Sequence, residues 1–490
     1  MSDKAAGDYA PSIPESAAIS IATIEARALS MRRHLTHEGP ATLDQRLDRL
    51  SRLERAIRAH ADLIAQAIEQ DFQVRGRLQS ILSDVYEPLS AARTSRSQAR
   101  LALLRQKIKL AFPFNIAGRA YLEAQPAGLV GVITPASDPV RLSLLILVDA
   151  LAAGNRVIIK PSEETPASAH LLDRMLGSEF DADEVSVVTG DAQVAQALAK
   201  MPIDHLVAAG SRPALSAIMA AAATNLTPVT LIPGGKSAAL VAPDFPINEA
   251  AEKIFTAKLI NAGQSCEAPD YALVSTTDEA EFVAAAQAAV QTHWERLEGH
   301  PDYAAVPSQN DRKRLQTLIA DAIEKGARLV PLGPSSEQFG PEQSKMRPAL
   351  LLSVTDDMEV LHTEIMGPIL PVLGYNHLED ALQFINAGDT APILSLFTHS
   401  PNWRRQVLNH ANIGGLIVND AGPGARPASL PFGTTGRAAS GLIGGVSGMM
   451  GLTRLTPVFE RFRLTVLPRT RPPFTAQDEA TINRLVRRGR

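Results

Sequence analysis

The spacing of apolar residues predicts that the chain begins with helices. Apolar side chains recur every three or four positions from Ile19 to about Arg105, a period typical of helices that bury one face. One such run consists of Leu43, Leu47, Leu50, Leu53 and Ile57. We therefore expect a helical packing layer here. The polar residues 1–18 before it, rich in Pro, Ser and Ala, are expected to be a mobile lead-in.

From residue 128 the pattern changes to short β-branched runs that alternate with amphipathic stretches. The predicted strands are Gly128–Thr134, Arg156–Ile159, Glu184–Val188, His205–Ala208 and Pro228–Ile232. The predicted helices are Val140–Ala153, Pro166–Leu176, Ala192–Lys200 and Ala214–Ala223. This alternation indicates parallel βαβ units with helices on both faces of a sheet, and such sheets bind ligands at the carboxyl ends of their strands.

A second alternating block begins near Glu249. Its predicted helices are Asp278–Glu295 and Glu379–Ala387, and its predicted strands lie near Leu350, Leu394 and Leu416. After Val418 the chain becomes Gly-rich, and the tail from residue 461 to 490 holds eight arginines against one Asp and one Glu. We interpret that tail as a solvated basic face rather than a specific site for an anion or a membrane.

Length and composition limit the class of protein. A chain of 490 residues exceeds the roughly 250 to 300 residues of a single core, so at least two domains are expected. The 45% hydrophobic and 20% charged residues are typical of soluble globular proteins, and the net charge of -4 gives no electrostatic case for binding nucleic acid. The apolar run over 142–153 is short and contains Asp149, which favours a buried helix over a membrane span.

The single cysteine bears on both compartment and chemistry. One Cys excludes an intramolecular disulfide and is consistent with a reducing compartment, and with no secretory leader evident we expect a cytoplasmic protein. No metal is predicted, because one thiol forms no cluster and no His-Glu-x-x-His segment occurs. Cys266 follows a small Gly-containing loop, Asn261–Ser265, where nearby backbone N–H groups could lower its pKa and hold an oxyanion. The competing interpretation is a buried structural cysteine.

Several segments, taken in order, resemble the aldehyde dehydrogenase family over about residues 20 to 475, and most closely its coniferyl-aldehyde dehydrogenase-like branch. They are residues 151–163, 227–231 with 234–237, 261–270, 364–372, 418–420 and 430–433. The resemblance implies an α/β fold with a Rossmann-type cofactor domain, an α/β catalytic domain and a small β extension for oligomerisation. It also places Cys266 at the family's nucleophile position.

The resemblance suggests how the chain is divided. After the lead-in, we expect a helical layer of the cofactor domain over 19–112, an oligomerisation β segment over 113–127 and an NAD-binding domain over 128–232. We then expect a catalytic domain over 233–420, a Gly-rich channel segment over 421–455, and an oligomerisation strand and basic tail over 456–490. The strand is expected at Phe462–Leu467, whose unpaired edge in a monomer favours a homodimer.

The family's cofactor contacts map onto several positions of this chain. The resemblance implies that Lys160 and Glu163 bind the adenosine ribose, and a carboxylate at 163 would repel a 2'-phosphate, so NAD is favoured over NADP. Gly210 and Ser211 match the turn that receives the pyrophosphate at a helix N-terminus, and Glu364 matches the residue that holds the nicotinamide ribose. The remaining expected cofactor contacts are Pro135 and Ser162.

Two positions depart from the family's catalytic pattern. Ser137 stands where the family has the Asn that donates to the oxyanion, and Ile232 stands where it has the general-base Glu. Loss of the donor typically lowers turnover by about 10² to 10³, and loss of a base by about 10² to 10⁴. Glu267, beside Cys266, is the nearest carboxylate in sequence, although a surface position is the favoured interpretation for it.

Three functions remain open from the sequence. The first is NAD-dependent oxidation of a hydrophobic or aromatic aldehyde through a Cys266 thiohemiacetal and thioester, with activity weakened by the two replacements. The second transfers the thioester to a thiol such as coenzyme A, which needs no water-activating Glu. The third is a catalytically degenerate homologue that acts as a binding or scaffold protein.

Overall fold

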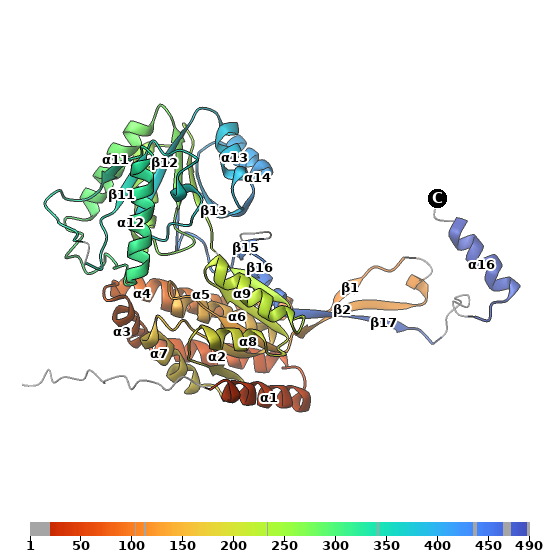
Figure 1. Ribbon diagram of the computed structural model, residues 1–490. Coiled ribbons are helices and arrows are strands. Elements are labelled where there is room, and N and C mark those ends of the chain that lie inside the picture. The colour runs from red at the N-terminus through yellow and green to blue at the C-terminus, as the bar shows by residue number, and fades with distance from the viewer. Residues whose placement is uncertain are drawn as a thin grey trace, which may run out of the picture.

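The computed structural model describes residues 20–102, 104–111, 114–232, 234–340, 343–434, 439–463 and 472–487. These residues form an α/β fold with two sheet-containing domains and a projecting antiparallel arm (Figure 1). The lead-in expected at residues 1–18 lies outside the described residues.

The first domain begins with the expected helices. They are α1 Ile21–Glu38, α2 Leu43–Ala59, α3 Ala61–Phe72, α4 Arg77–Ser80, the π-helix η1 Ile81–Tyr86 and α5 Glu87–Ala102. A capping box fixes the start of α2, because Thr42 Oγ1 accepts the Gln45 N–H and the Gln45 side chain accepts the Thr42 N–H. The end of the helical stretch corrects the sequence interpretation. Residues Gln106–Ile108 form a short strand, β1, within the predicted helical layer 19–112.

Five parallel strands form the first sheet in the order β5-β4-β3-β6-β7. The strands are β3 Leu129–Ile133, β4 Arg156–Lys160, β5 Val185–Val187, β6 His205–Ala209 and β7 Val229–Ile232, and the intervening helices are α6 Pro139–Ala153, α7 Pro166–Gly177, α8 Ala192–Ala199 and α9 Arg212–Ala223. Every element predicted in this block is confirmed to within one or two residues. The direction of winding reverses at β3, which pairs with β4 on one side and β6 on the other. Ligands bind at such a switch point.

Helix α6 is the centre of the first domain. All of its residues are buried, including Arg141 and Asp149, and it contacts α2, α5 and the short helix α15 Gly445–Gly451. The prediction of a buried helix is confirmed. None of the helices in the described part of the chain has the length and apolarity to cross a membrane.

The second domain contains a seven-stranded sheet in the order β10-β11-β12-β9-β8-β13-β14, parallel except for the edge strand β10. Its strands are β8 Ala238–Val241, β9 Tyr271–Ser275, β10 Arg328–Pro331, β11 Ala349–Leu352, β12 Ile369–Tyr375, β13 Ala391–Phe397 and β14 Ile413–Val418. Its helices are α10 Ile247–Leu259, α11 Glu279–His293, α12 Gln309–Glu324, α13 Leu378–Ala387 and α14 Pro401–His410, with short 3-10 turns η3 Ile260–Gly263 and η4 Glu359–Leu361. The predicted helices are confirmed as α11 and α13, and the predicted strands as β11, β13 and β14.

A three-stranded antiparallel arm projects away from both domains (Figure 1). It consists of β1, β2 Gly118–Pro126 and β17 Thr453–Arg461, with the 3-10 turn η2 Phe114–Ile116 between β1 and β2. The small hairpin β15 Phe432–Thr434 and β16 Gly441–Ile443 precedes β17, and helix α16 Ala476–Arg487 follows it. β17 overlaps the expected oligomerisation segment 456–490, but it ends at Arg461, before the strand expected at Phe462–Leu467. Phe462 and Arg463 are not in a strand, and 464–467 lie outside the described residues.

Candidate functional site

The candidate site lies where the first sheet meets the loop between α10 and β9. Asn261 in this loop donates from Nδ2 to the backbone oxygen of Ser137, at 3.4 Å, and Ser137 belongs to the turn between β3 and α6. Cys266 packs against the hydrophobic core of the first domain. The cysteine therefore lies at the carboxyl end of β3, the switch point of the first sheet.

The loop before Cys266 has an unusual backbone. Asn261, Ala262 and Gly263 all have positive φ, at 50°, 49° and 74°. For the two non-glycine residues such a conformation costs on the order of 1–3 kcal/mol each, and it persists only where surrounding contacts hold it. Gly263 is required, because a Cβ there would lie 2.3 Å from the backbone oxygen of Gly367.

Hydrogen bonds hold this loop on several sides. Gln264 donates from Nε2 to the backbone oxygen of Ala305 at 2.8 Å, and Ser237 Oγ donates to the backbone oxygen of Cys266 at 2.7 Å. These bonds fix the backbone on either side of the thiol. Such fixation is what a positioned nucleophile needs.

The thiol of Cys266 is free and half-buried. The sequence interpretation that backbone N–H groups could lower its pKa is wrong. Burial raises the pKa of the Cys266 thiol well above its ordinary value, and the carboxylates of Glu267, Asp138 and Glu364 raise it further. Arg141 acts in the opposite direction without outweighing them. The thiol is therefore protonated at neutral pH, and its ionisation must be coupled to transfer of the proton.

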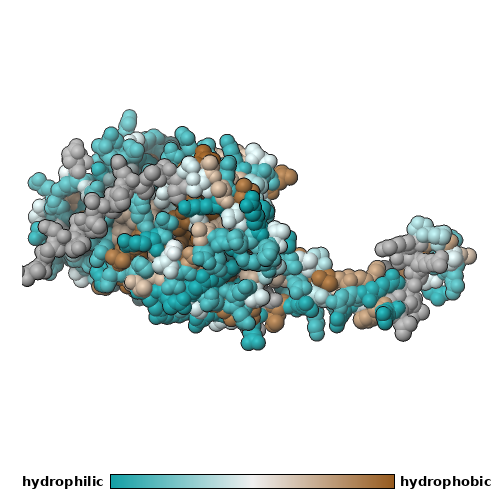
Figure 2. Space-filling model, turned by 90° about the horizontal axis from the view of Figure 1, so that it is seen from below, coloured by the Kyte–Doolittle hydropathy of each residue, from teal (hydrophilic) through white to brown (hydrophobic). Residues whose placement is uncertain are grey.

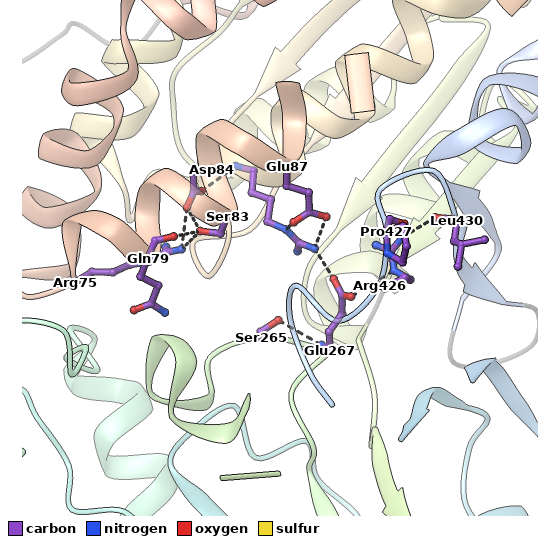
Figure 3. A network of polar contacts seen from close by, with 11 residues as sticks. Arg75, Gln79, Ser83, Asp84, Glu87, Ser265, Glu267, Arg426, Pro427 and Leu430 are labelled. Atoms are coloured by element: carbon purple, nitrogen blue, oxygen red, sulfur yellow. Dashed lines mark hydrogen bonds and ion pairs between the residues drawn. The ribbon is translucent and has the colours of Figure 1, made fainter. Parts of the chain in front are cut away.

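Glu267 is buried, which corrects its interpretation as a surface residue. Its carboxylate accepts from Arg141 Nη2 and from Arg426 Nε, the latter at 3.4 Å (Figure 3). Burial alone would raise the pKa of Glu267, but the two guanidinium groups hold it below its usual value. A carboxylate kept ionised in this way is a poor proton acceptor.

The charged network extends from Glu267 into the helices of the first domain. Arg141 Nε donates to Glu87 at 2.6 Å, and the Arg141 backbone N–H donates to Asp84 Oδ1 at 3.1 Å. Arg75 Nη2 donates to the other oxygen of Asp84 at 2.8 Å. Figure 3 shows Asp84 and Glu87 on adjoining helical turns above the loop that carries Glu267. Every member of the network has a partner of opposite charge.

The expected cofactor residues lie at the carboxyl edge of the first sheet. Lys160 ends β4, and its ammonium forms an ion pair with Glu163, three residues later. The Lys160 side chain is 3% exposed and that of Glu163 is 43% exposed, so a buried ammonium group is paired with a carboxylate at the surface. Pro135 and Ser162 each lie two residues after the end of a strand, β3 and β4 respectively.

The residues expected at the pyrophosphate and nicotinamide ribose lie at a helix N-terminus and beside Gly235. Ser211 is the N-cap of α9, and its hydroxyl accepts no N–H of the first turn. A Cβ at Gly210 would meet no atom within 4 Å, so the backbone before this helix N-terminus is open to a phosphate. Glu364 Oε1 accepts the Gly235 N–H at 3.1 Å. Burial, followed by the charge of Asp270, raises the pKa of Glu364 to about 7. That these residues bind a cofactor stays a prediction.

The two positions expected to depart from the family's pattern, Ser137 and Ile232, lie near the ends of different strands of the first sheet, β3 and β7. Ser137 is half-buried in the turn after β3, whereas Ile232 is buried at the end of β7, where it belongs to the core. No hydrogen bond joins either side chain to Cys266 within the described residues.

The sequence interpretation missed Asp138, Arg141 and Arg426. The sequence does contain a signal for Arg141, because this residue lies between Val140 and Leu142 at the start of an apolar helix. A charge inside such a run requires a buried partner. The identity of the partners could not be read from the sequence, because Glu87 and Glu267 are 54 and 126 residues away.

The chain was compared with protein families, with known sequences and with solved structures. The model of the aldehyde dehydrogenase family matches residues 16–458. A probable coniferyl aldehyde dehydrogenase of Caulobacter vibrioides is 36% identical over 442 residues, 89% of this chain and 91% of the relative. One of Pseudomonas aeruginosa is 37% identical over 430 residues, 88% and 89% of the two chains. The structure of Staphylococcus aureus AldH in a substrate-bound state, 28% identical, superposes with a TM-score of 0.83 over 94% of this chain and 99% of that chain.

Proposed function

Because the chain belongs to the aldehyde dehydrogenase family, we propose that it oxidises a hydrophobic or aromatic aldehyde to the acid, with Cys266 as nucleophile and NAD as oxidant. The aromatic substrate is inferred from the relatives described as coniferyl aldehyde dehydrogenases. The observation that carries the mechanism is the position of the only thiol, half-buried on a strained loop at the switch point of the first sheet.

The proposed reaction uses two covalent intermediates on Cys266. The Cys266 thiol gives up its proton to water as its sulfur attacks the carbonyl carbon of the aldehyde, which forms a thiohemiacetal. The Ser137 hydroxyl can donate a hydrogen bond to the oxyanion of this intermediate. Bound NAD+ would supply a hydride acceptor for the carbon-bound hydrogen. The resulting thioester is cleaved by water, which releases the acid and returns the thiol.

The cofactor preference is proposed from Glu163. In the family position for the adenosine ribose, its carboxylate would accept from ribose hydroxyls and repel a 2'-phosphate. The ion pair with the buried Lys160 supports this, because it keeps the carboxylate at the edge of the sheet. NAD is therefore the proposed cofactor, with Pro135, Ser162, Gly210, Ser211 and Glu364 as further contacts.

Two other functions are favoured by particular observations. Ile232 is apolar and buried, so it activates no water, which favours transfer of the acyl group to a thiol such as coenzyme A. The raised pKa of Cys266, together with Ser137 and Ile232, favours a homologue that binds a dinucleotide with little or no turnover. Oxidation with hydrolysis remains the first proposal, because Cys266, Lys160 and Glu163 have no evident use in a scaffold.

One experiment separates the three functions. NADH formation is followed with a panel of aromatic and aliphatic aldehydes, with and without coenzyme A, for the natural chain and for Cys266→Ala. The proposal expects NADH without coenzyme A and none from Cys266→Ala. Turnover that requires coenzyme A selects acyl transfer, and NAD binding without turnover selects the degenerate homologue. Product formation by Cys266→Ala would rule out the covalent mechanism.

A homodimer is proposed from the arm. Its exposed apolar side chains include Ile108, Phe114, Ile116, Leu455 and Phe459, and Figure 2 shows such side chains along the projecting arm. Its outer strands β1 and β17 each have one edge unpaired within the described residues. A second copy of this chain can cover both features. The cytoplasmic location stays a prediction from the single cysteine.

A further inference from the structure

The carboxyl group of Asp138 is free although its position predicts a helix cap. Asp138 is the N-cap residue of α6, where an Asp side chain usually accepts an N–H of the first turn. Here it caps nothing, because Asp84 from η1 accepts the Arg141 N–H in its place, at 3.1 Å. Asp138 accepts no side-chain hydrogen bond from any residue that the structure describes.

The surroundings of this carboxyl group are charged but already paired. Asp138 is 5% exposed, and it faces Arg141 on its own helix, Arg75 before α4, Asp84 on η1 and Glu267 beside Cys266. Arg75 is bonded to Asp84, and Arg141 to Glu87 and Glu267. Burial therefore dominates and raises the pKa of Asp138 to about 7. A group with this pKa is divided between acid and base near neutral pH, which suits proton transfer.

Asp138 is also the neighbour of a residue that contacts the cysteine loop. It directly follows Ser137, whose backbone oxygen accepts from Asn261 in the cysteine loop. Its charge is one of those that raise the pKa of the Cys266 thiol. Of the other carboxylates that act on this thiol, Glu267 is held by two arginines and Glu364 accepts the Gly235 N–H. Asp138 is the one without a hydrogen-bond partner in the described chain.

We propose that Asp138 is the general base that activates water against the Cys266 thioester, in place of the Glu that Ile232 replaces. This proposal rests on the proposed function. The Asp138 carboxylate takes one proton from water as the water oxygen bonds to the thioester carbon. The carbon–sulfur bond then breaks, the sulfur leaves with its electron pair, and Asp138 returns the proton to it. The step consumes one water, releases the acid and changes no oxidation state.

The test is rapid-mixing measurement of NADH with Asp138→Asn, an aromatic aldehyde and NAD. Formation of the thioester needs no water, so a burst of about one NADH per Cys266 is expected to remain. Steady-state turnover is expected to fall about 10²- to 10⁴-fold. Hydroxylamine attacks a thioester without a base, so adding it should restore turnover in this variant. Asp138→Glu should retain more turnover than Asp138→Asn.

Asp149→Asn is the matched control, since Asp149 is a buried carboxyl group of the same helix that accepts the Gly444 N–H. For Asp149→Asn, the rate of NADH formation in the burst divided by the steady-state rate should equal the same ratio in the natural chain. The proposal is overturned if Asp138→Asn keeps the natural ratio, or if it raises KM for the aldehyde while kcat stays unchanged. Absence of any NADH formation by the natural chain contradicts the proposed function instead, so the two failures are distinguishable.

Discussion

At the scale of single residues, the ion pair between Lys160 and Glu163 has the clearest consequence for ligand choice. The lysine is buried and the glutamate is partly exposed, so removal of the carboxylate leaves a buried ammonium group without its partner. An uncompensated buried charge is unfavourable, and a bound phosphate would compensate it. The same carboxylate would repel the 2'-phosphate of NADP.

Glu163→Gln should therefore shift cofactor use towards NADP. The ratio of kcat/KM for NADP to that for NAD is expected to rise about tenfold or more, equivalent to about 1.4 kcal/mol. Steady-state kinetics with both cofactors measures the ratio. Glu164→Gln, a change at the exposed neighbouring carboxylate, should leave it within about twofold. An unchanged ratio in Glu163→Gln would exclude the ribose contact.

Residue identities carried over from the family could be stated from the sequence, but their electrostatics could not. The resemblance assigned roles to Cys266, Lys160 and Glu163 by motif, and these roles stay predictions. It did not predict that the pKa of Cys266 is raised, since this depends on burial and on carboxylates brought from α6 and from residue 364. Glu267 was assigned to the surface because its partners, Arg141 and Arg426, are distant in sequence.

At the scale of elements, the regular parts of the chain were predictable and the irregular parts were not. The strands of the first sheet are continuous apolar runs between helices, and their bounds were predicted to within one or two residues. β1 was missed because its three residues are exposed and carry no alternating pattern. β17 was placed too late because its exposed and partly buried positions lack a continuous apolar run.

Helix α6 connects the elements of the first domain through its buried charges. Arg141 in its first turn binds Glu87 on α5 and Glu267 in the cysteine loop, and Asp149 near its other end accepts the Gly444 N–H before α15 at 2.6 Å. Burial raises the pKa of Asp149 to about 7, although the bond from Gly444 opposes the shift. In an unfolded chain an Asp has a pKa of about 3.9.

This shift gives stability a defined dependence on pH. Between about pH 4 and pH 7 the folded state binds a proton at Asp149 that the unfolded state has lost, so the free energy of unfolding contributed by this group falls as pH rises. Asp149→Asn removes the titration and keeps an oxygen that can accept from Gly444. The free energy of unfolding, measured with urea, should therefore fall less between pH 5.5 and pH 8 in this variant than in the natural chain.

The exposed Asp173 on α7 provides the control for that measurement. Asp173→Asn should show the same loss of stability between the two pH values as the natural chain. If the free energy of unfolding falls as much between pH 5.5 and pH 8 in Asp149→Asn as in the natural chain, the role assigned to Asp149 is contradicted.

At the scale of the whole molecule, the arm is the feature that a single copy leaves incomplete. β17 pairs with β2 over nine residues on one side and with no strand of the described chain on the other. Leu455 and Phe459 on β17 are 42% and 46% exposed. An unpaired strand edge with apolar side chains favours association.

Leu455→Arg should weaken association of two copies. A charge at the centre of a covered apolar surface has no partner and loses its hydration, so the dissociation constant is expected to rise at least tenfold. Sedimentation equilibrium measures it. Leu226→Arg is the control, because Leu226 is 88% exposed on the body after α9 and should leave the mass unchanged. A natural chain that is monomeric at micromolar concentration would exclude the proposed dimer.

The pairing of β2 with β17 also sets an order of events during synthesis. The two strands are contributed by residues 118–126 and 453–461, so more than three hundred residues are translated after the first before the second exists. Domains fold as the chain emerges from the ribosome, and both sheets precede β17 in sequence. The arm is therefore the last part to form. A chain terminated before β17 would present β2 with β1 on one edge and no strand on the other, and only chains that extend through β17 would be competent to assemble.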